Sequence, residues 1–224
     1  MVHTGDSPEP TPTRWAQELI GDDWQAYSDR FAKLFAEGAD VDGEARFADM
    51  LAAPGSRILD AGCGPGRVTA ALQARGHDVI GVDADAGLVA DGQARYPGVA
   101  LFHRDLLELD ADWLTQAGGP TEFDLIVCPG NVMVFLAAGS ERQVLHRMAA
   151  VLRPGGRAVF GFATGREYTI DDLDRDAASV GWVFEHRFAT WQLDPFTAGA
   201  GWAVTVYRAP STAADAADAG APST

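Results

Sequence analysis

The segment from 57 to 74 most constrains how this chain can fold. An apolar run from Arg57 to Ala61 leads into a loop with glycines at 62, 64 and 66, and a helical pattern follows from Arg67 to Ala74. A buried strand that runs through a glycine loop into a helix is typical of a doubly wound sheet, which binds its ligand at the carboxyl ends of its strands. The glycines let a ligand approach the backbone, and the helix start offers unpaired N–H groups that suit an anion.

Strand and helix patterns alternate along the rest of the chain. Short apolar runs predict strands at 78–83, 99–103, 122–128, 157–162, 182–191 and 202–208. Helical patterns cover 42–51, 140–152 and 169–180, with Ser140 and Gln143 as a capping box and Pro154-Gly155-Gly156 ending the second helix. This alternation predicts an α/β fold: a doubly wound, mostly parallel seven-stranded sheet with a terminal antiparallel hairpin strand and helices on both faces.

Composition divides the chain into four parts. Residues 1–13 are rich in Pro and Thr, residues 209–224 consist of Ala, Asp, Ser, Thr, Gly and Pro, and we expect both ends to be disordered. Residues 52–208 are predicted to form the ligand-binding core. Residues 14–51 are predicted to form N-terminal helices whose aromatic stripe either packs on the sheet or closes over the ligand as a lid; the stripe consists of Trp24, Tyr27, Phe31 and Phe35.

The chain is strongly acidic, with 17 Lys and Arg against 32 Asp and Glu and a net charge of −15. Nucleic-acid binders need a cationic face, and an anionic membrane surface attracts basic segments. We therefore expect no nucleic acid and no membrane as partners. The chain contains no run of 18 apolar residues and no apolar core near its N-terminus, which predicts a cytoplasmic location.

The cysteines and histidines do not form a metal-binding pattern. Cys63 and Cys128 are the only cysteines, too few for a four-ligand zinc site, and we expect them as buried thiols at the ends of central strands. The five histidines are scattered, and His186, between Phe184 and Phe188, is expected to pack in the core. The sequence therefore predicts no metal.

The glycine loop differs from a nicotinamide-binding loop. That fingerprint, G-x-G-x-x-G, would place its third glycine at position 67, which is Arg. The spacing here is D-x-G-x-G-x-G, with Asp60 two residues before Gly62. A carboxylate at that position suits a ligand that carries an amino group. The pattern resembles the first motif of the class I S-adenosylmethionine-dependent methyltransferases, and the alternation of strands and helices extends the resemblance over roughly residues 45–208.

The resemblance implies S-adenosyl-L-methionine as the cofactor and methyl transfer to a small-molecule acceptor. Asp60 would hold the ammonium of the methionine moiety, directly or through water, and Asp83, at the end of the second strand, would accept from both ribose hydroxyls. Asp105 would accept from the adenine amine while Leu106 packs on the ring. The cofactor-binding residues are therefore expected to be Asp60, Gly62, Gly64, Gly66, Asp83, Ala84, Asp105, Leu106 and Pro129.

The acceptor site is expected after the fourth strand, where the family places it, and this makes Gly130 and Asn131 substrate-binding residues. Pro129-Gly130-Asn131 departs from the Asp/Asn-Pro-Pro-aromatic motif of methyltransferases that act on nucleic-acid bases. For the methionine carboxylate four donors remain open: Tyr27, Arg46, Arg67 and the helix start after Gly66. We assign no catalytic base, because an amine or thiolate acceptor needs none during attack.

Three other functions can be compared with this prediction. A non-catalytic S-adenosylmethionine-binding protein would carry the same motifs. An NAD-dependent oxidoreductase is opposed by Asp60 and Arg67. An aminopropyl transferase would need an acidic polyamine pocket, which the sequence after Cys128 does not supply.

Overall fold

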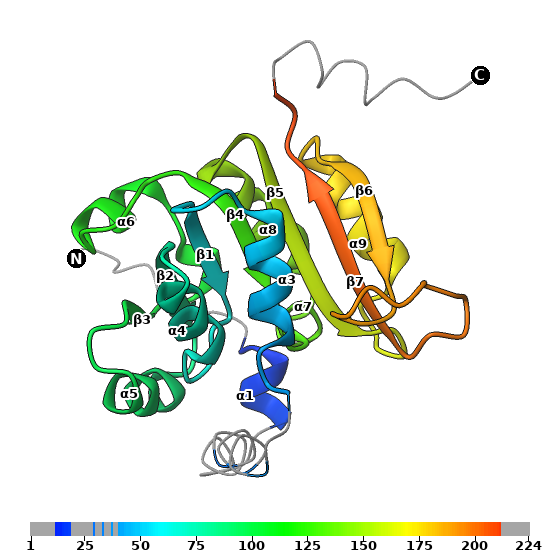
Figure 1. Ribbon diagram of the computed structural model, residues 1–224. Helices are drawn as coiled ribbons and strands as arrows, with labels where there is room; N and C mark the ends of the chain where they lie inside the picture. Colours follow the sequence, from blue (N-terminus) through cyan, green and yellow to red (C-terminus); the bar gives the residue numbers. More distant parts are fainter. Residues whose placement is uncertain (1–11, 19–28, 30–32, 34–36, 38–39, 212–224) are drawn as a thin grey trace, which may run out of the picture.

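The computed structural model describes residues 12–18, 29, 33, 37 and 40–211 (Figure 1). The elements are α1 (Arg14–Glu18), α3 (Gly43–Leu51), β1 (Arg57–Ala61), α4 (Arg67–Ala74), β2 (Asp78–Asp83), α5 (Ala86–Arg95), β3 (Leu101–His103), the 3-10 helix η1 (Leu106–Glu108), α6 (Ala111–Gln116), β4 (Phe123–Cys128), α7 (Val132–Phe135), α8 (Glu141–Val151), β5 (Leu152–Ala163), α9 (Ile170–Ser179), β6 (Val183–Phe188) and β7 (Trp202–Arg208). The aromatic stripe predicted between 22 and 36 lies outside the described residues.

Seven strands form one sheet in the order β3-β2-β1-β4-β5-β7-β6. The strands from β3 to β5 pair in parallel, whereas β7 runs antiparallel to both β5 and β6. The strand order reverses between β1 and β4, and such a switch point leaves a crevice at the carboxyl ends of the strands. The predicted fold class is confirmed, including the reversed strand of the terminal hairpin.

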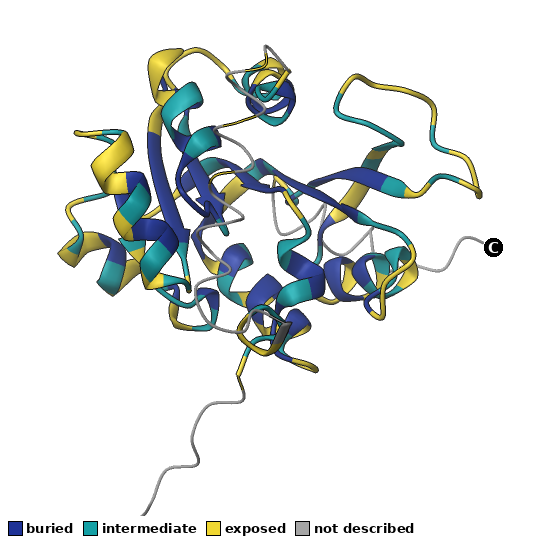
Figure 2. Cartoon of the chain, turned by 90° about the horizontal axis from the view of Figure 1, so that it is seen from below, coloured by how far each residue is buried: buried dark blue, intermediate teal, exposed yellow. Residues whose placement is uncertain are grey.

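The side chains of β1 show how the two faces of the sheet are covered. Ile58 and Leu59 are neighbours in sequence, and successive side chains of a strand point to opposite faces. Ile58 packs in a cluster with Phe47 of α3 and Leu72 of α4, whereas Leu59 packs in another with Met148 of α8. Helices α3 and α4 therefore cover one face and α8 the other, and buried residues concentrate along the central strands between them (Figure 2).

The predicted capping box of α8 is wrong. The hydroxyl of Ser140 donates to the carbonyl of Ala137 at 2.7 Å and makes no capping bond to α8. A capping box is found instead at α9, where Thr169 and Asp172 exchange their hydrogen bonds. Ser140 is in the αR conformation, whereas a capping residue is ordinarily extended, as Thr169 is.

Strand β5 begins earlier than predicted. Its pairing with β4 jumps from Leu152 opposite Phe123 to Arg157 opposite Leu125. The Pro-Gly-Gly segment within 153–156 therefore bulges out of the ladder, with Gly155 at a φ of 71°. The helix has already ended at Val151, so the turn residues separate two parts of one strand instead of a helix from a strand.

Two predictions about buried side chains had different outcomes. Cys63 and Cys128 are free and buried, as predicted. His186 is exposed, so its predicted place in the core is wrong. It belongs to β6, the edge strand of the sheet, where Phe184 is also 51% exposed. Among the described residues, no helix is both long and apolar enough to cross a membrane.

Candidate functional site

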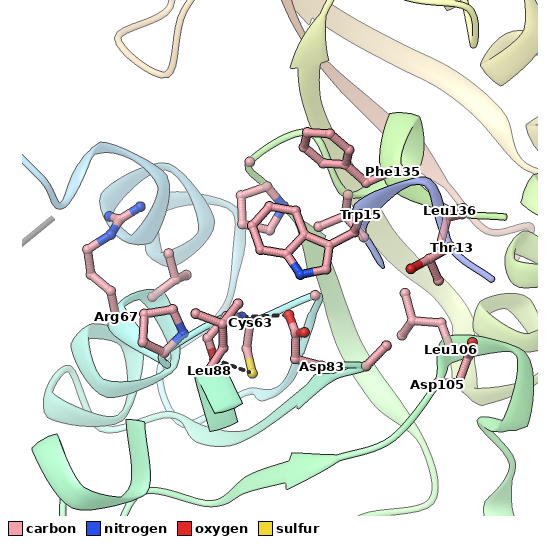
Figure 3. A pocket seen from close by; sticks show the side chains of 18 of the residues that line it. Thr13, Trp15, Cys63, Arg67, Asp83, Leu88, Asp105, Leu106, Phe135 and Leu136 are labelled. Atoms are coloured by element: carbon pink, nitrogen blue, oxygen red, sulfur yellow. Dashed lines mark hydrogen bonds between the residues drawn. The ribbon is translucent and has the colours of Figure 1, made fainter. Parts of the chain in front are cut away.

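A pocket lies at the carboxyl ends of the parallel strands, beside the switch point between β1 and β4 (Figure 3). Eight of the eleven residues predicted for the site line it. They come in pairs from the ends of four strands: Gly62 and Gly64 after β1, Asp83 and Ala84 at β2, Asp105 and Leu106 after β3, and Pro129 and Gly130 after β4. Asp60, Gly66 and Asn131 do not line it.

The loop after β1 requires glycine for two reasons. Gly62 and Gly66 have φ of 79° and 77°, a conformation that residues with a Cβ rarely adopt. A Cβ at Gly62 would lie 2.2 Å from Cγ2 of Val132, and one at Gly66 would lie 2.5 Å from Cδ1 of Leu101. The loop therefore packs tightly against Val132 and Leu101, and Gly66 supports it without lining the cavity.

Asp83 fixes the loop and also faces the pocket. Its Oδ2 accepts from the backbone N–H of Gly64 at 2.8 Å, and its Oδ1 accepts from the N–H of Asp85 at 2.8 Å. Burial raises the pKa of this carboxyl, while the two amide bonds oppose that effect. A carboxylate has about four lone-pair sites, so the two amides leave acceptor capacity for a ligand.

Asp60 lies beneath the loop and is fully buried. Its Oδ2 accepts from the hydroxyl of Thr69 on α4 at 2.7 Å, and its Oδ1 has no hydrogen-bond partner. Burial raises the pKa of this carboxyl to about 7. A buried carboxyl with one unsatisfied oxygen is costly, and a water or a ligand cation is the kind of partner that would satisfy it.

Asp105 and Asn131 both make bonds that shape the chain around the pocket. Asp105 accepts from the N–H of Leu107 at 2.8 Å and caps η1, yet it also lines the pocket beside Leu106. Asn131 has a φ of 73°, and its Oδ1 accepts from the N–H of Ala163 at the end of β5 at 2.8 Å. Its side chain therefore ties the turn after β4 to β5, which leaves Gly130 at the pocket wall.

Helix α1 lies at the pocket, within the segment 14–51 that was expected either to pack on the sheet or to close over the ligand, and the sequence patterns did not indicate which residues it contacts. The indole Nε1 of Trp15 donates to Asp85 at 2.9 Å, so this ring lies across the pocket from α1 to the start of α5 (Figure 3). Arg14 donates to the buried carboxylate of Glu141 on α8 at 2.8 Å and to the carbonyl of Leu136 at 3.2 Å. These hydrogen bonds attach α1 to the start of α5, to the end of α7 and to the start of α8.

The pocket wall formed by α7 is apolar, and it was not predicted from the sequence. Val132, Phe135 and Leu136 line the pocket there, and the Phe135 ring meets the Trp15 ring edge to face at 5.4 Å. The guanidinium of Arg166 lies over Phe135, 5.5 Å from the ring centroid. The sequence feature that could have indicated this wall is the apolar run at 132–136, which follows the fourth strand, where the acceptor site was expected.

The candidates for an anion donor lie at different distances from the pocket. Arg67 lines it and is paired with Glu44 of α3 at 2.8 Å. Arg46 does not line it, and its Nη1 donates to Asp40 at 2.8 Å. Tyr27 lies outside the described residues. Helix α4 begins directly behind the loop, so its first amides remain candidates as well.

Neither a thiol nucleophile nor a metal is indicated at this site. Cys63 lines the pocket, but burial raises the pKa of its thiol well above the usual value, so it stays protonated at neutral pH. In the part of the chain that the structure describes, no three His, Cys, Asp or Glu side chains gather as metal ligands would. The charged side chains that line the pocket are the carboxylates of Glu44, Asp83 and Asp105 and the guanidinium of Arg67.

Comparison with known proteins agrees with this geometry. Residues 58–156 match the family described as "Methyltransferase domain". A crystal structure of a TehB-like SAM-dependent methyltransferase from Corynebacterium glutamicum is 38% identical, with a TM-score of 0.76. The similarity covers 83% of this chain and 97% of that one.

Two curated relatives match over shorter stretches. A trans-aconitate 2-methyltransferase of Methylobacterium nodulans is 41% identical over 108 residues, which is 47% of this chain and 37% of the relative. A demethylmenaquinone methyltransferase of Beutenbergia cavernae is 37% identical over 115 residues, 50% of this chain and 42% of the relative. The matched segments thus span less than half the length of either relative.

Proposed function

The chain belongs to the S-adenosylmethionine-dependent methyltransferase family, and on that premise we propose that it transfers a methyl group from S-adenosylmethionine to a small-molecule acceptor. The observation that carries this proposal is the pocket at the ends of four parallel strands, with Asp83 bound to the glycine loop on one side and open to the cavity on the other. Family membership confirms the resemblance and the cofactor predicted from the sequence.

The residues present suit each part of S-adenosylmethionine. The lone pairs of Asp83 that are not used by the two backbone amides can accept hydrogen bonds from both ribose hydroxyls. The small side chain of Ala84 leaves room for the ribose. Asp105 can accept from the adenine amine, with Leu106 against the ring. Gly62 and Gly64 let the chain of the cofactor approach the loop backbone, and Pro129 closes the side toward β4.

The methionine end suits the residues around the loop. Asp60, whose Oδ1 is unsatisfied beneath the loop, would stabilise the ammonium through water, because it does not itself line the pocket. Arg67 and the first amides of α4 are the donors placed for the carboxylate. Arg46 is a weaker candidate because it is engaged with Asp40 outside the pocket.

When bound, the cofactor supplies a methyl carbon activated by a positively charged sulfur. The residues of this chain then have to orient the acceptor and exclude water. Gly130 offers a wall without a side chain beside the reacting end, while Asn131 holds that turn through β5. Trp15 and Phe135 close the opposite side, and such alignment can supply several kcal/mol of the barrier.

The nature of the acceptor follows from the relatives and from charge. The two curated relatives carry the names of enzymes acting on trans-aconitate and demethylmenaquinone, both small molecules. A net charge of −15 disfavours nucleic acid. A non-catalytic cofactor-binding protein is the alternative, since it would present the same pocket.

Transfer of a labelled methyl group distinguishes a methyltransferase from a non-catalytic cofactor-binding protein. The chain is incubated with S-adenosylmethionine labelled in its methyl group and a fraction of cell extract below 1 kDa. We expect a labelled small molecule and a matching amount of S-adenosylhomocysteine, both dependent on active chain. Tight binding of the cofactor without any labelled product from a range of extracts would favour the non-catalytic alternative.

A further inference from the structure

The end of the pocket between α1 and α7 is mostly apolar, and its polar side chain beside Trp15 is Thr13, whose hydroxyl accepts from the N–H of Ala16 at 3.1 Å. Its walls are Trp15, Val132, Phe135 and Leu136. Trp15 carries the only polar side-chain atom among these four, and that atom already donates to Asp85 at 2.9 Å. None of these side chains carries a charge, so a cation that recognises an anionic substituent on the acceptor has to come from a residue beside this wall.

Arg166 lies beside it. This residue belongs to the loop between β5 and α9, is exposed, and places its guanidinium 5.5 Å from the centroid of the Phe135 ring. The neighbouring carboxylates of Glu141 and Glu167 contact Arg14 instead, at 2.8 and 3.5 Å. In the described part of the chain, no carboxylate oxygen lies within 4.0 Å of Arg166.

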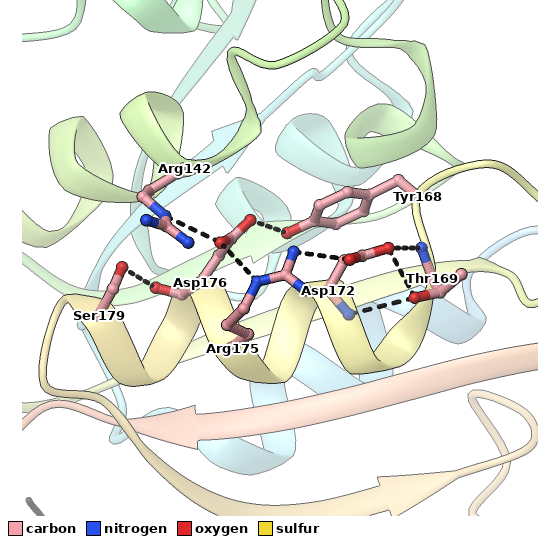
Figure 4. A network of polar contacts seen from close by, with 7 residues as sticks. All are labelled: Arg142, Tyr168, Thr169, Asp172, Arg175, Asp176 and Ser179. Carbon is pink, nitrogen blue, oxygen red and sulfur yellow. Dashed lines mark hydrogen bonds and ion pairs between the residues drawn. The ribbon is translucent and has the colours of Figure 1, made fainter.

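The loop that carries Arg166 is held in place two residues later. The hydroxyl of Tyr168 donates to the buried carboxylate of Asp176 at 3.1 Å, and Arg142 of α8 donates to the other oxygen at 3.0 Å (Figure 4). Thr169 then begins α9 with its capping box. The backbone after Arg166 is thus fixed to two helices, which fixes the point from which the side chain of Arg166 extends toward Phe135.

We propose that Arg166 binds an anionic group of the acceptor, a carboxylate, while the flat apolar body of that acceptor lies against Phe135 and Trp15. This proposal rests on the methyl transfer proposed above and names the acceptor class as planar carboxylic acids. The guanidinium fork pairs with a carboxylate through two parallel hydrogen bonds, and a position over an aromatic ring orients the fork.

The charge of the whole chain gives a second reason. An acidic protein repels an anionic ligand, and a cation without a carboxylate partner at the pocket rim lowers that barrier locally. Arg67 lines the pocket and Arg14 lies on α1 next to the lining residue Trp15, but both are paired with glutamates. Arg166 is therefore the rim arginine whose charge is available to an incoming anion.

The test compares carboxylates with their neutral amides. The full chain is saturated with S-adenosylhomocysteine and titrated calorimetrically with three pairs: cinnamate and cinnamamide, 4-hydroxybenzoate and 4-hydroxybenzamide, trans-aconitate and its triamide. In at least one pair we expect the carboxylate to bind roughly tenfold or more tightly than the amide. Arg166→Gln should abolish this preference, and Arg166→Lys should keep part of it because the charge remains.

Arg95→Gln is the matched control, since it removes the same charge from the far end of α5. It should keep the preference, and all three variants should bind S-adenosylhomocysteine as the unmodified chain does. Equal binding of acid and amide in every pair, absence of binding by all three acids, or a preference that survives Arg166→Gln would each overturn the proposal. A chain that fails to bind S-adenosylhomocysteine at all would instead contradict the proposed function.

Discussion

Asp60 and Asp83 come from neighbouring strands but have different environments. Asp83 meets the pocket and bonds to two backbone amides, one in the glycine loop and one at the start of α5. Asp60 is sealed beneath the loop with one oxygen bonded to Thr69 and the other unsatisfied. The first carboxylate is placed to bind ligand directly, and the second is placed to support the loop and respond to charge above it.

Removing the carboxylate of Asp83 should weaken cofactor binding. Asp83→Ala deprives the ribose hydroxyls of their acceptors and frees the N–H of Gly64, and the loss of charge-assisted bonds costs about 1.5–3 kcal/mol. The dissociation constant for S-adenosylhomocysteine, measured by calorimetry, should rise roughly tenfold or more. Asp78→Ala, at the exposed start of β2, is the control. An unchanged affinity in folded Asp83→Ala would remove Asp83 from the ribose site.

The buried carboxyl of Asp60 should make stability depend on pH. Its folded pKa of about 7 lies above the ordinary value of 3.8, so the folded state holds a proton that the unfolded state releases. The stability that this proton contributes is complete below about pH 4 and is lost as the pH rises through 7.

The comparison variant is Asp60→Asn, which has no proton to lose. The unfolding free energy of the unmodified chain relative to this variant should fall by about 2 kcal/mol between pH 5.5 and pH 8, at about 1.4 kcal/mol for each unit up to the folded pKa. Urea unfolding at four pH values measures this difference. A difference that stays constant with pH would mean that Asp60 is ionised throughout.

Among the elements, β1, its loop and α4 could be predicted from the sequence because every local rule agrees there. The apolar run, the glycines and the helical pattern all indicate the same structure. For helix α1 the sequence left two alternatives open, packing on the sheet or closing over the ligand, because the position of α1 depends on contacts distant in sequence. Arg14 meets Glu141 127 positions away, and Trp15 meets Asp85 70 positions away.

In the site too, some residues could be predicted from the sequence and others could not. Residues at strand ends were predicted because the topology of a parallel sheet brings those ends together. The apolar wall on α7 was missed, since nothing local distinguishes Phe135 from a core residue. Asp60 was expected to hold the ammonium directly or through water, and it lies beneath the loop without lining the pocket; the depth of a side chain beneath a backbone cannot be predicted from motif spacing.

Helix α1 should respond to the cofactor more strongly than the rest of the fold. It has five residues, and its side-chain contacts to other elements that are described above come from Arg14 and Trp15 alone, so it should open locally at low cost. S-adenosylhomocysteine should therefore slow amide hydrogen exchange in residues 14–18 while leaving the hairpin of β6 and β7 unchanged. Equal exchange in 14–18 with and without ligand would make α1 a fixed part of the wall and not a lid.

For the whole molecule, the sheet gathers four strand ends at one pocket, and the acidic composition restricts what enters it. The fold, the cofactor and the family agree with the first of these features, and the second disfavours nucleic acid as the acceptor. The central claim is that this pocket takes S-adenosylmethionine and not a nicotinamide dinucleotide. The evidence for it is the D-x-G-x-G-x-G loop, with Arg67 where a nicotinamide loop has its third glycine.

Calorimetric titration of the full chain with S-adenosylmethionine, and separately with NAD, tests that claim most directly. We predict one S-adenosylmethionine bound per chain and no heat from NAD under the same conditions. Binding of NAD without binding of S-adenosylmethionine would contradict the account.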